Sequence, residues 1–340
     1  MPWSKKVKRL AIVASLLCFS YASDFADEAL EKIVRQYRQN GLQQVENSIQ
    51  TLLEEKRYWL LALQNQDVSY GYYESYRYLF VSNKSIPNLT LYQINDGKLT
   101  QLGVTNALVG SGKGNKKVSG DLTTPIGVYD LLNKLKKLDQ YYGPMAFVTS
   151  YPNVYDKSLK KTGYGIWIHG MPLNGNRDEL NTKGCIAIEN DEITKFDKQI
   201  KYNDTLLITY ENTFIPTTKD EIASILSELF QWKEAWQKGD FEKYISFYNI
   251  DFKKSNGMKY DRYKSYKERI FSKKEVKQIN LSKINIAPYP NEEGKKLFRV
   301  TFNQDYAAFN GEKLTYRSNG KKELYIILDS QNHFTILLEE

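Results

Sequence analysis

Reactive side chains are scarce in this 340-residue sequence, which has only two cysteines and two histidines. They are Cys18 and Cys185, and His169 and His333. Cys18 lies in a segment that we interpret below as a cleaved signal, and one cysteine and two histidines cannot supply the usual nitrogen and sulfur ligands of zinc without carboxylates, so we predict no metal site. The four glycines between positions 110 and 120 form neither a GxxxxGK[ST] motif nor a GxGxxG motif that a helix follows, so nucleotide binding is not expected. We therefore predict that the protein uses no cofactor.

A long hydrophobic run is also missing near the start of the chain. The apolar run at residues 10–19 has about ten residues, whereas a membrane-spanning helix needs roughly 20. Four basic residues precede it, and Ser20-Tyr21-Ala22 places small residues where a signal peptidase cleaves. We interpret residues 1–22 as a cleaved export signal and predict an exported protein with no integral membrane segment after cleavage; an uncleaved anchor is the alternative.

The positive charge of the chain is modest once this segment is removed. The net charge falls from +8 to +4, because residues 1–22 contain four basic residues and no acidic ones. The remaining lysines are interspersed with acidic residues, which is typical of a solvated surface and predicts no nucleic-acid partner. An anionic cell-wall polymer is compatible with this charge.

Cleavage would leave Cys185 as the only cysteine of the mature chain. Exported proteins meet an oxidising compartment, where cysteines usually pair. Cys185 has no internal partner for a disulfide, so it is either a buried, inert thiol or a reactive one.

Residues 23–66 show a helical pattern of apolar residues that Asn40-Gly41 interrupts, which predicts a helical hairpin within an N-terminal segment at 23–69. Two such helices cannot bury both apolar stripes against each other. We therefore expect them to pack on the next domain or on a second copy of the chain, as a homodimer.

The pattern changes to period two after this segment, which predicts a mostly β domain at residues 70–211. Its expected strands are 78–81, 89–92, 99–102, 128–131, 166–168 and 205–210. Residues 171–183 form a 13-residue connection, and loops of this length are usually functional.

We place a separate α+β domain at residues 212–340, with a linker at 213–219 at its start. Its apolar patterns predict helices at 222–236, 241–252 and 260–271 and strands at 279–286, 297–306, 324–328 and 334–338.

The chemistry is expected at His169 and Cys185, which lie sixteen residues apart at the ends of two short apolar runs. A neighbouring imidazole takes the thiol proton and makes the thiolate a strong nucleophile toward acyl carbons. The imidazole itself needs a partner on its far nitrogen, and the carbonyl of Gly170 is a candidate. The backbone amides near Gly184 and Cys185 are candidates for binding an oxyanion. Taken alone, this pair of residues would also fit a buried structural cysteine and a packed histidine without a catalytic role.

The complete amino-acid sequence of this stretch resembles a known signature. Gly165-Ile166-Trp167-Ile168-His169-Gly170, a loop, and Thr182-Lys183-Gly184-Cys185-Ile186 resemble the HG…[S/T]xGC pattern of the L,D-transpeptidase catalytic domain, the YkuD family. Thr124-Pro125-Ile126-Gly127 corresponds to the TPxG segment of that family. The resemblance implies a sandwich-like β domain in which Cys185 is the nucleophile, His169 the base and the carbonyl of Gly170 the group that orients it.

Two positions depart from the family pattern. Most members carry a second histidine before the Gly-Cys pair and an arginine two residues after the cysteine, where this chain has Lys183 and Ala187. Some members with alanine there are hydrolases. The arrangement of the whole chain resembles the periplasmic L,D-carboxypeptidases of curved and helical Gram-negative bacteria, whose C-terminal domain is similar to the nuclear transport factor 2 (NTF2) fold.

The resemblance implies a multidomain α+β protein that removes the terminal D-alanine from peptidoglycan stem tetrapeptides and so influences cell shape. Thr182, Lys183, Gly184 and Arg177 are the predicted substrate-binding residues. One alternative is a transpeptidase that forms 3-3 crosslinks or attaches a protein amine. A second is a peptidoglycan-binding protein with a vestigial catalytic domain.

Overall fold

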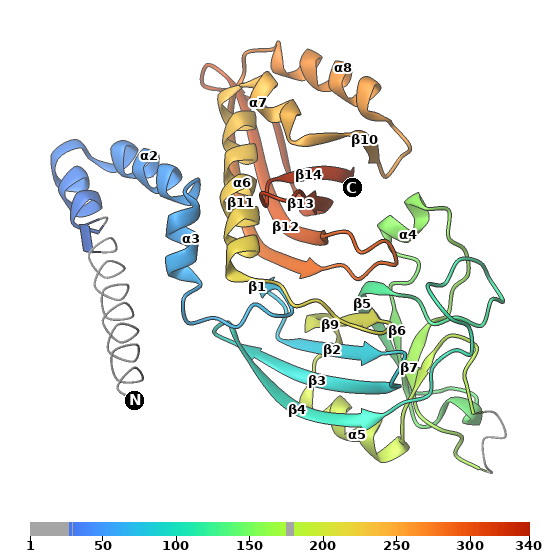
Figure 1. Ribbon diagram of the computed structural model, residues 1–340. Coiled ribbons are helices and arrows are strands. Elements are labelled where there is room, and N and C mark those ends of the chain that lie inside the picture. Colours follow the sequence, from blue (N-terminus) through green and yellow to red (C-terminus); the bar gives the residue numbers. More distant parts are fainter. Residues whose placement is uncertain (1–26, 29, 175–179) are drawn as a thin grey trace, which may run out of the picture.

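The protein has two β-sheets, each with its own helices, and a helical N-terminal segment (Figure 1). The computed structural model describes residues 27–28, 30–174 and 180–340. The expected export signal at residues 1–22 lies outside this range. A mixed α and β architecture with N-terminal helices, a mostly β middle domain and a C-terminal α+β domain is confirmed. Within the described ranges, no helix combines the length and the apolarity needed to cross a membrane.

The N-terminal segment is helical at residues 30–40 and continues with two further helices. Gly41, with a φ of 76°, ends the first helical run where the sequence predicts a break. A second break at Glu54 and Glu55, which the pattern did not reveal, separates the other two helices. The two helices are α2 (Leu42–Leu53) and α3 (Lys56–Ala62).

Helix α3 packs against the C-terminal domain and not against the domain that follows it in the chain. The ring of Trp59 stacks on Phe230 of the long helix α6 (Lys219–Lys238), with 5.7 Å between the ring centroids. Leu63 is completely buried in the same core. Helices α3 and α6 lie far apart in the chain, and for this reason the order of elements in the sequence did not predict the contact.

The middle domain is an eight-stranded sheet in the order β4-β3-β2-β9-β5-β6-β7-β8. Strand β9 lies between β2 and β5, so both of its edges are paired. Its two faces are covered as well, because Leu207 belongs to one apolar cluster and Leu206 and Ile208 to another, and residues 205–209 are all buried. Helix α5 packs Ile193 and Phe196 into the core of this domain. The sequence reading missed α5 because its other residues are mostly polar. The elements are β2 (Tyr78–Asn83), β3 (Asn88–Asn95), β4 (Lys98–Asn106), β5 (Gly127–Leu135), η1 (Gln140–Tyr142), β6 (Ala146–Thr149), α4 (Val154–Ser158), β7 (Trp167–His169), β8 (Ile186–Ala187), α5 (Asn190–Gln199), η2 (Tyr202–Asp204) and β9 (Thr205–Tyr210).

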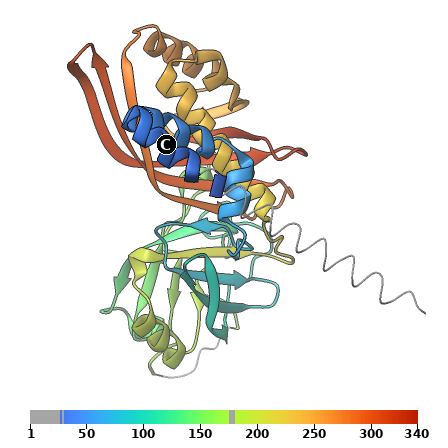
Figure 2. The same ribbon diagram turned by 90° about the vertical axis from the view of Figure 1, so that its left-hand side faces the viewer.

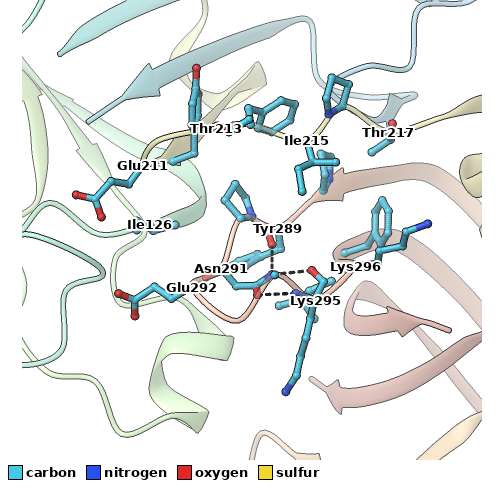
Figure 3. A pocket seen from close by; sticks show the side chains of 18 of the residues that line it. Ile126, Glu211, Thr213, Ile215, Thr217, Tyr289, Asn291, Glu292, Lys295 and Lys296 are labelled. Atoms are coloured by element: carbon cyan, nitrogen blue, oxygen red, sulfur yellow. Dashed lines mark hydrogen bonds between the residues drawn. The ribbon is translucent and has the colours of Figure 1, made fainter. Parts of the chain in front are cut away.

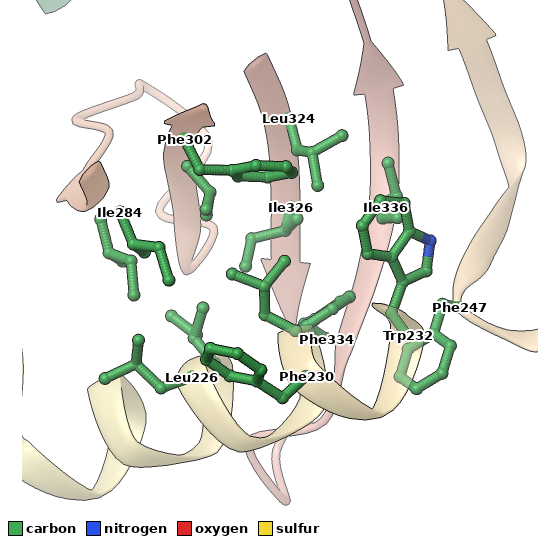
Figure 4. Close-up of a cluster of buried hydrophobic side chains, with 14 of the residues drawn as sticks. Leu226, Phe230, Trp232, Phe247, Ile284, Phe302, Leu324, Ile326, Phe334 and Ile336 are labelled. Atoms are coloured by element: carbon green, nitrogen blue, oxygen red, sulfur yellow. The ribbon is translucent and has the colours of Figure 1, made fainter. Parts of the chain in front are cut away.

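The C-terminal domain is a six-stranded sheet with α6 packed across one face. Leu226, Phe230 and Trp232 of α6 face the sheet residues Phe302 and Ile336 in a single apolar core (Figure 4). The strand order is β1-β11-β12-β13-β14-β10, so β1, which lies at the start of the segment predicted as the 70–211 domain, joins this sheet instead. The elements are β1 (Tyr72–Tyr73), α7 (Phe241–Ser246), β10 (Tyr248–Lys254), α8 (Tyr260–Phe271), β11 (Val276–Pro288), β12 (Leu297–Asn310), β13 (Lys313–Leu328) and β14 (Phe334–Glu339).

One helix of this domain was predicted too long. Residues 241–252 were expected to form a single helix, but α7 ends at Ser246 and β10 begins at Tyr248. Strand β10 pairs in parallel with β14, at the far end of the chain. Pairing with a distant strand thus overrides a local aromatic pattern that fits a helix.

The two domains share a buried interface (Figure 2). The guanidinium of Arg299 on β12 binds Asp130 of β5 at 2.6 Å and Glu323 of β13 at 2.9 Å. Tyr155 of the middle domain stacks on Tyr325 of the C-terminal domain with 5.0 Å between ring centroids. An apolar cluster that contains Val128, Leu206 and Tyr325 continues across the boundary. These contacts hold the domains together.

Candidate active site

The parallel pair β7 and β8 brings His169 and Cys185 to one face of the sheet. Ile168 pairs with Ile186 and His169 pairs with Ala187, so Cys185, one residue before β8, lies beside Trp167. Residues that pair laterally point to the same face, and side chains two positions apart on one strand also share a face. The sulfur of Cys185 accepts a hydrogen bond from the Trp167 amide at 3.4 Å and lies 3.4 Å from the Gly165 carbonyl, to which its S–H donates.

The imidazole of His169 is buried, with 1% of its surface exposed. Its Nδ1 lies 2.7 Å from the carbonyl oxygen of Gly170. A carbonyl only accepts hydrogen bonds, so Nδ1 carries the hydrogen and Nε2 of the neutral ring is left with the basic lone pair. The ring of Tyr142 packs edge-on against the imidazole, with 5.1 Å between centroids. The histidine is therefore fixed in one tautomer and one orientation.

Both side chains open into a cavity of about 590 Å³. The glycine-rich loop, residues 110–122, forms one wall of this cavity through Lys116, Ser119, Gly120 and Leu122. Aromatic side chains form its rim, and Tyr164 is 88% exposed there. A space of this size, bounded by a thiol, an imidazole, lysines and tyrosines, can hold a short polar peptide.

The glycine-rich loop is held in shape by Asp121. Its carboxylate accepts hydrogen bonds from the Lys116 ammonium at 2.6 Å and from the amides of Lys117 and Val118 at 2.7 and 3.0 Å. Burial raises the pKa of Asp121, but the hydrogen bonds from Lys116 and the backbone amides outweigh this effect and lower the pKa to about 2. Sequence reasoning missed this network, because a lysine and an aspartate among glycines look like ordinary loop residues.

The predicted substrate-binding residues fall into three groups. The Thr182 hydroxyl donates to the Cys185 carbonyl at 2.7 Å and accepts from the Gly184 amide at 3.1 Å, so both residues shape the turn before the thiol. Gly184 has a φ of 124°, and a Cβ there would lie 2.9 Å from the Thr123 carbonyl oxygen. Lys183 is exposed and lines the cavity. Arg177 lies outside the described residues.

The Gly184 amide was one of the expected oxyanion donors, and in this structure it donates to Thr182. Ala187, which stands where most family members have an arginine, is completely buried between β7 and Leu108. The described residues contain no group of three or more histidine, cysteine and acidic side chains placed to hold a metal ion.

A second cavity, of about 420 Å³, lies between the domains and shares no lining residue with the first. It lies between linker residues such as Glu211 and Ile215 and the turn that carries Asn291 (Figure 3). The Asn291 amide bridges this turn by donating to the carbonyls of Tyr289 and Lys295 at 3.1 and 2.8 Å. The predicted catalytic pair, His169 and Cys185, does not line this second cavity.

Comparisons with known proteins agree with this geometry. The family model of the L,D-transpeptidase catalytic domain (YkuD) matches residues 77–208, and the model of the Cds6 C-terminal NTF2-like domain matches residues 224–340. The chain belongs to the L,D-transpeptidase (YkuD) family, in the group that carries an NTF2-like C-terminal domain.

Among solved structures, the chain is similar to the helical cell shape determining protein Pgp2 from Campylobacter jejuni. The two are 41% identical, the match covers 84% of this chain and 99% of Pgp2, and the TM-score is 0.78. A point variant of Pgp2 matches at 41% identity with a TM-score of 0.79, covering 85% of this chain and 99% of the other. Bd1075 from Bdellovibrio bacteriovorus is 27% identical, with coverage of 81% and 96% and a TM-score of 0.63. A comparison with curated protein sequences finds no match.

Proposed function

We propose that the protein is a periplasmic L,D-carboxypeptidase that shortens peptidoglycan stem tetrapeptides to tripeptides with Cys185 as its nucleophile. The observation that carries this proposal is the fixed imidazole of His169, which lines the same cavity as the Cys185 thiol and is bound at Nδ1 by the Gly170 carbonyl. This arrangement suits acyl transfer, because it supplies a nucleophile and an oriented base on one face of a rigid sheet.

In the first half-reaction, Nε2 of His169 takes the proton of the Cys185 thiol. The thiolate attacks the carbonyl carbon between the L-centre of diaminopimelate and the terminal D-alanine, which forms a carbon–sulfur bond and a tetrahedral oxyanion. The carbon–nitrogen bond then breaks, and the D-alanine amine leaves with the proton from the imidazolium. A thioester remains on Cys185.

In the second half-reaction, a water molecule loses a proton to Nε2 of His169 and attacks the thioester carbonyl. The carbon–sulfur bond breaks and releases the tripeptide as a carboxylic acid. The sulfur leaves as a thiolate, which the imidazolium reprotonates, so the enzyme returns to its starting state. Lys183 lines the cavity, and in this proposal its positive charge attracts a carboxylate of the substrate.

Ala187 favours hydrolysis over crosslinking in this proposal. Its side chain is only a methyl group, which is completely buried, so this position offers no guanidinium that could bind a second stem peptide. The alternative is transpeptidation, in which an amine takes the place of water at the thioester and every catalytic residue is the same. The other alternative, a binding protein with a vestigial catalytic domain, gives no reason for the ordered histidine beside a scarce thiol.

The similarity to Pgp2, which is described as determining helical cell shape, supports a role in cell shape for this chain as well. Trimming stem peptides removes the tetrapeptides that serve as acyl donors for crosslinks, and this gives the reaction a route to the shape of the wall.

The test is the profile of purified muropeptides incubated with the protein, with the Cys185→Ala variant and with the His169→Ala variant. We expect the intact protein to convert tetrapeptides to tripeptides with release of D-alanine, and both variants to leave them unchanged. New dimeric muropeptides would support the transpeptidase instead. Unchanged tetrapeptides with the folded, intact protein would refute both reactions, and retained binding to peptidoglycan would then support the binding protein.

A further inference from the structure

The peptide bond between Gly170 and Met171 is held at both of its ends. Its carbonyl oxygen lies 2.7 Å from Nδ1 of His169, and its N–H donates to Oδ1 of Asn190 at 2.9 Å. A single planar amide therefore connects the side chain of Asn190 to the imidazole. Asn190 is the first residue of helix α5, in a segment that sequence reasoning did not include in the site.

The Asn190 side chain is closely packed into this position. A Cβ added to either Gly170 or Gly143 would collide with its Oδ1. The amide of Gly170 in turn donates to the carbonyl of Tyr142 at 3.0 Å. Both peptide units that flank Gly170 are thus fixed, and the glycines at 143 and 170 provide the space that the asparagine needs.

We infer that Asn190 is a positioning residue for His169, which acts through the Gly170–Met171 peptide. A hydrogen bond accepted from the N–H of an amide increases the electron density on its carbonyl oxygen, so the two bonds strengthen each other. A stronger acceptor at Nδ1 stabilises the imidazolium that forms when Cys185 gives up its proton. The arrangement takes the place of the carboxylate that orients histidine in other catalytic triads, and an amide keeps it uncharged.

This inference rests on the proposed function for its catalytic consequence, but the ionisation of Cys185 can be measured without any substrate. The readout is the rate of alkylation of Cys185 by iodoacetamide as a function of pH. Alongside it, kcat and KM are measured on the muropeptide tetrapeptide. Failure of the tetrapeptide assay with the intact protein would count against the proposed function alone, because the alkylation profile still reports on Asn190.

The variants separate the acceptor from the packing. Asn190→Leu keeps a similar volume without an acceptor, Asn190→Ala removes both, and Asn190→Asp keeps an oxygen for the Met171 amide. Asp191→Ala is the matched control, since Asp191 is exposed in the same turn of α5. Loss of one hydrogen bond behind a reacting group is expected to slow alkylation at pH 7 about tenfold. We expect this loss, with a midpoint at higher pH, for Asn190→Leu and Asn190→Ala.

For the Asp191→Ala control, we expect a rate and a midpoint close to those of the intact protein. Asn190→Asp keeps the acceptor and adds a negative charge behind the imidazole, so we expect no loss of rate and a midpoint at lower pH. The value of kcat should follow the same order with little change in KM. A folded Asn190→Leu protein whose alkylation midpoint and rate equal those of the intact protein would overturn the inference. If both variants that lack the acceptor fail to fold, an altered alkylation midpoint in the folded Asn190→Asp protein would still support it, because a carboxylate adds charge behind the imidazole, and an unaltered one would overturn it.

Discussion

At the scale of single residues, the site depends on glycines that leave space for other groups. Gly170 supplies the carbonyl for His169, and its missing side chain makes room for Asn190. Gly184 allows the tight turn before Cys185, because a Cβ there would press on the Thr123 carbonyl. The imidazole of His169 and the thiol of Cys185 are thus placed by backbone segments in which an added Cβ would collide with a neighbouring atom.

A Gly170→Ala substitution should test this dependence on space. The new methyl group would collide with Asn190, and overpacking of this kind costs roughly 1–3 kcal/mol of unfolding free energy. We expect most of the activity to be lost as the carbonyl moves away from Nδ1. Urea denaturation and the muropeptide assay check both effects. The control is Gly320→Ala, where a Cβ meets no atom within 4 Å; if Gly170→Ala behaved like this control, the close packing would be disproved.

Asp121 leads to a prediction about pH. Its pKa is lowered to about 2 in the folded protein from an ordinary value near 3.8, so the folded state binds the proton less readily than the unfolded chain. The stability that this carboxylate contributes is therefore fully present above about pH 4 and is lost as the pH falls toward 2. We expect Asp121→Asn to be less stable than the intact protein at pH 7 and the difference to shrink below pH 4, as measured by urea denaturation. A difference that does not change with pH would contradict the assignment.

At the scale of elements, local signals set the helix ends while distant partners set the strands. Helix α6 begins with a capping box, in which the Thr218 hydroxyl accepts from the Glu221 amide and the Glu221 carboxylate accepts from the Thr218 amide. It ends at Gly239, which is in the left-handed conformation. This helix supplies much of the core of the C-terminal domain and also holds α3, so its ends matter to both segments.

Replacing the capping residue should weaken this helix measurably. Thr218→Ala removes the hydroxyl that accepts the Glu221 amide, and loss of such a cap costs about 1 kcal/mol. We expect a lower midpoint in chemical denaturation with no change in the alkylation rate of Cys185, which lies in the other domain. Thr213→Ala, in the exposed linker upstream, is the control. Equal midpoints for the two variants would argue against a stabilising cap.

At the scale of the whole molecule, the buried ion pairs of Arg299 connect the domains. Its side chain is 3% exposed, and it forms ion pairs with both Asp130 and Glu323. Burial raises the pKa of Asp130, but the nearby Arg299 and Lys321 charges outweigh it and hold that pKa well below its ordinary value. Arg299 and Glu323 belong to the C-terminal domain and Asp130 belongs to the middle domain, so the Asp130 carboxylate would lose its cation if the domains separated.

Removing the arginine should uncouple the domains. Arg299→Met leaves two buried carboxylates without their cation, which costs roughly 3–5 kcal/mol. We expect unfolding to separate into two transitions in differential scanning calorimetry. Lys321→Met is the matched control, because Lys321 also lies 3.8 Å from Asp130 but is 52% exposed, and exposed pairs contribute about 1 kcal/mol or less. A single transition at the original temperature in Arg299→Met would contradict the prediction.

The exposed face of the N-terminal helices bears on whether whole molecules associate. Leu30, Val34 and Tyr37 lie on one face of the first helical run and are each more than half exposed. We propose that this face packs against the same face of a second copy, and we expect a dimer mass in light scattering. Leu30→Glu with Val34→Glu should give a monomer, whereas Lys32→Glu should not. Whole-segment deletion is unsuitable, because Trp59 and Leu63 belong to the C-terminal core. A monomer mass for the intact protein would refute the proposal.

Elements whose signals are local could be predicted from the amino-acid sequence. The TPxG segment and the stretch around His169 and Cys185 were sufficient to assign the YkuD domain, because they are short patterns of fixed spacing. The predicted strand at 205–210 matches β9 and the predicted helix at 260–271 matches α8, because apolar periodicity, turn residues and breaks operate over a few residues.

The contacts between groups that are distant in the sequence became apparent in the three-dimensional fold. It placed α3 on α6, turned residues 248–254 into a strand beside β14, and set Arg299 between carboxylates of two domains. It also brought Asn190 to the Met171 amide, a contact between elements whose sequence gives no sign of it. Such contacts depend on strand order and on the packing of elements far apart in the chain, and neither is encoded in the local spacing of residues.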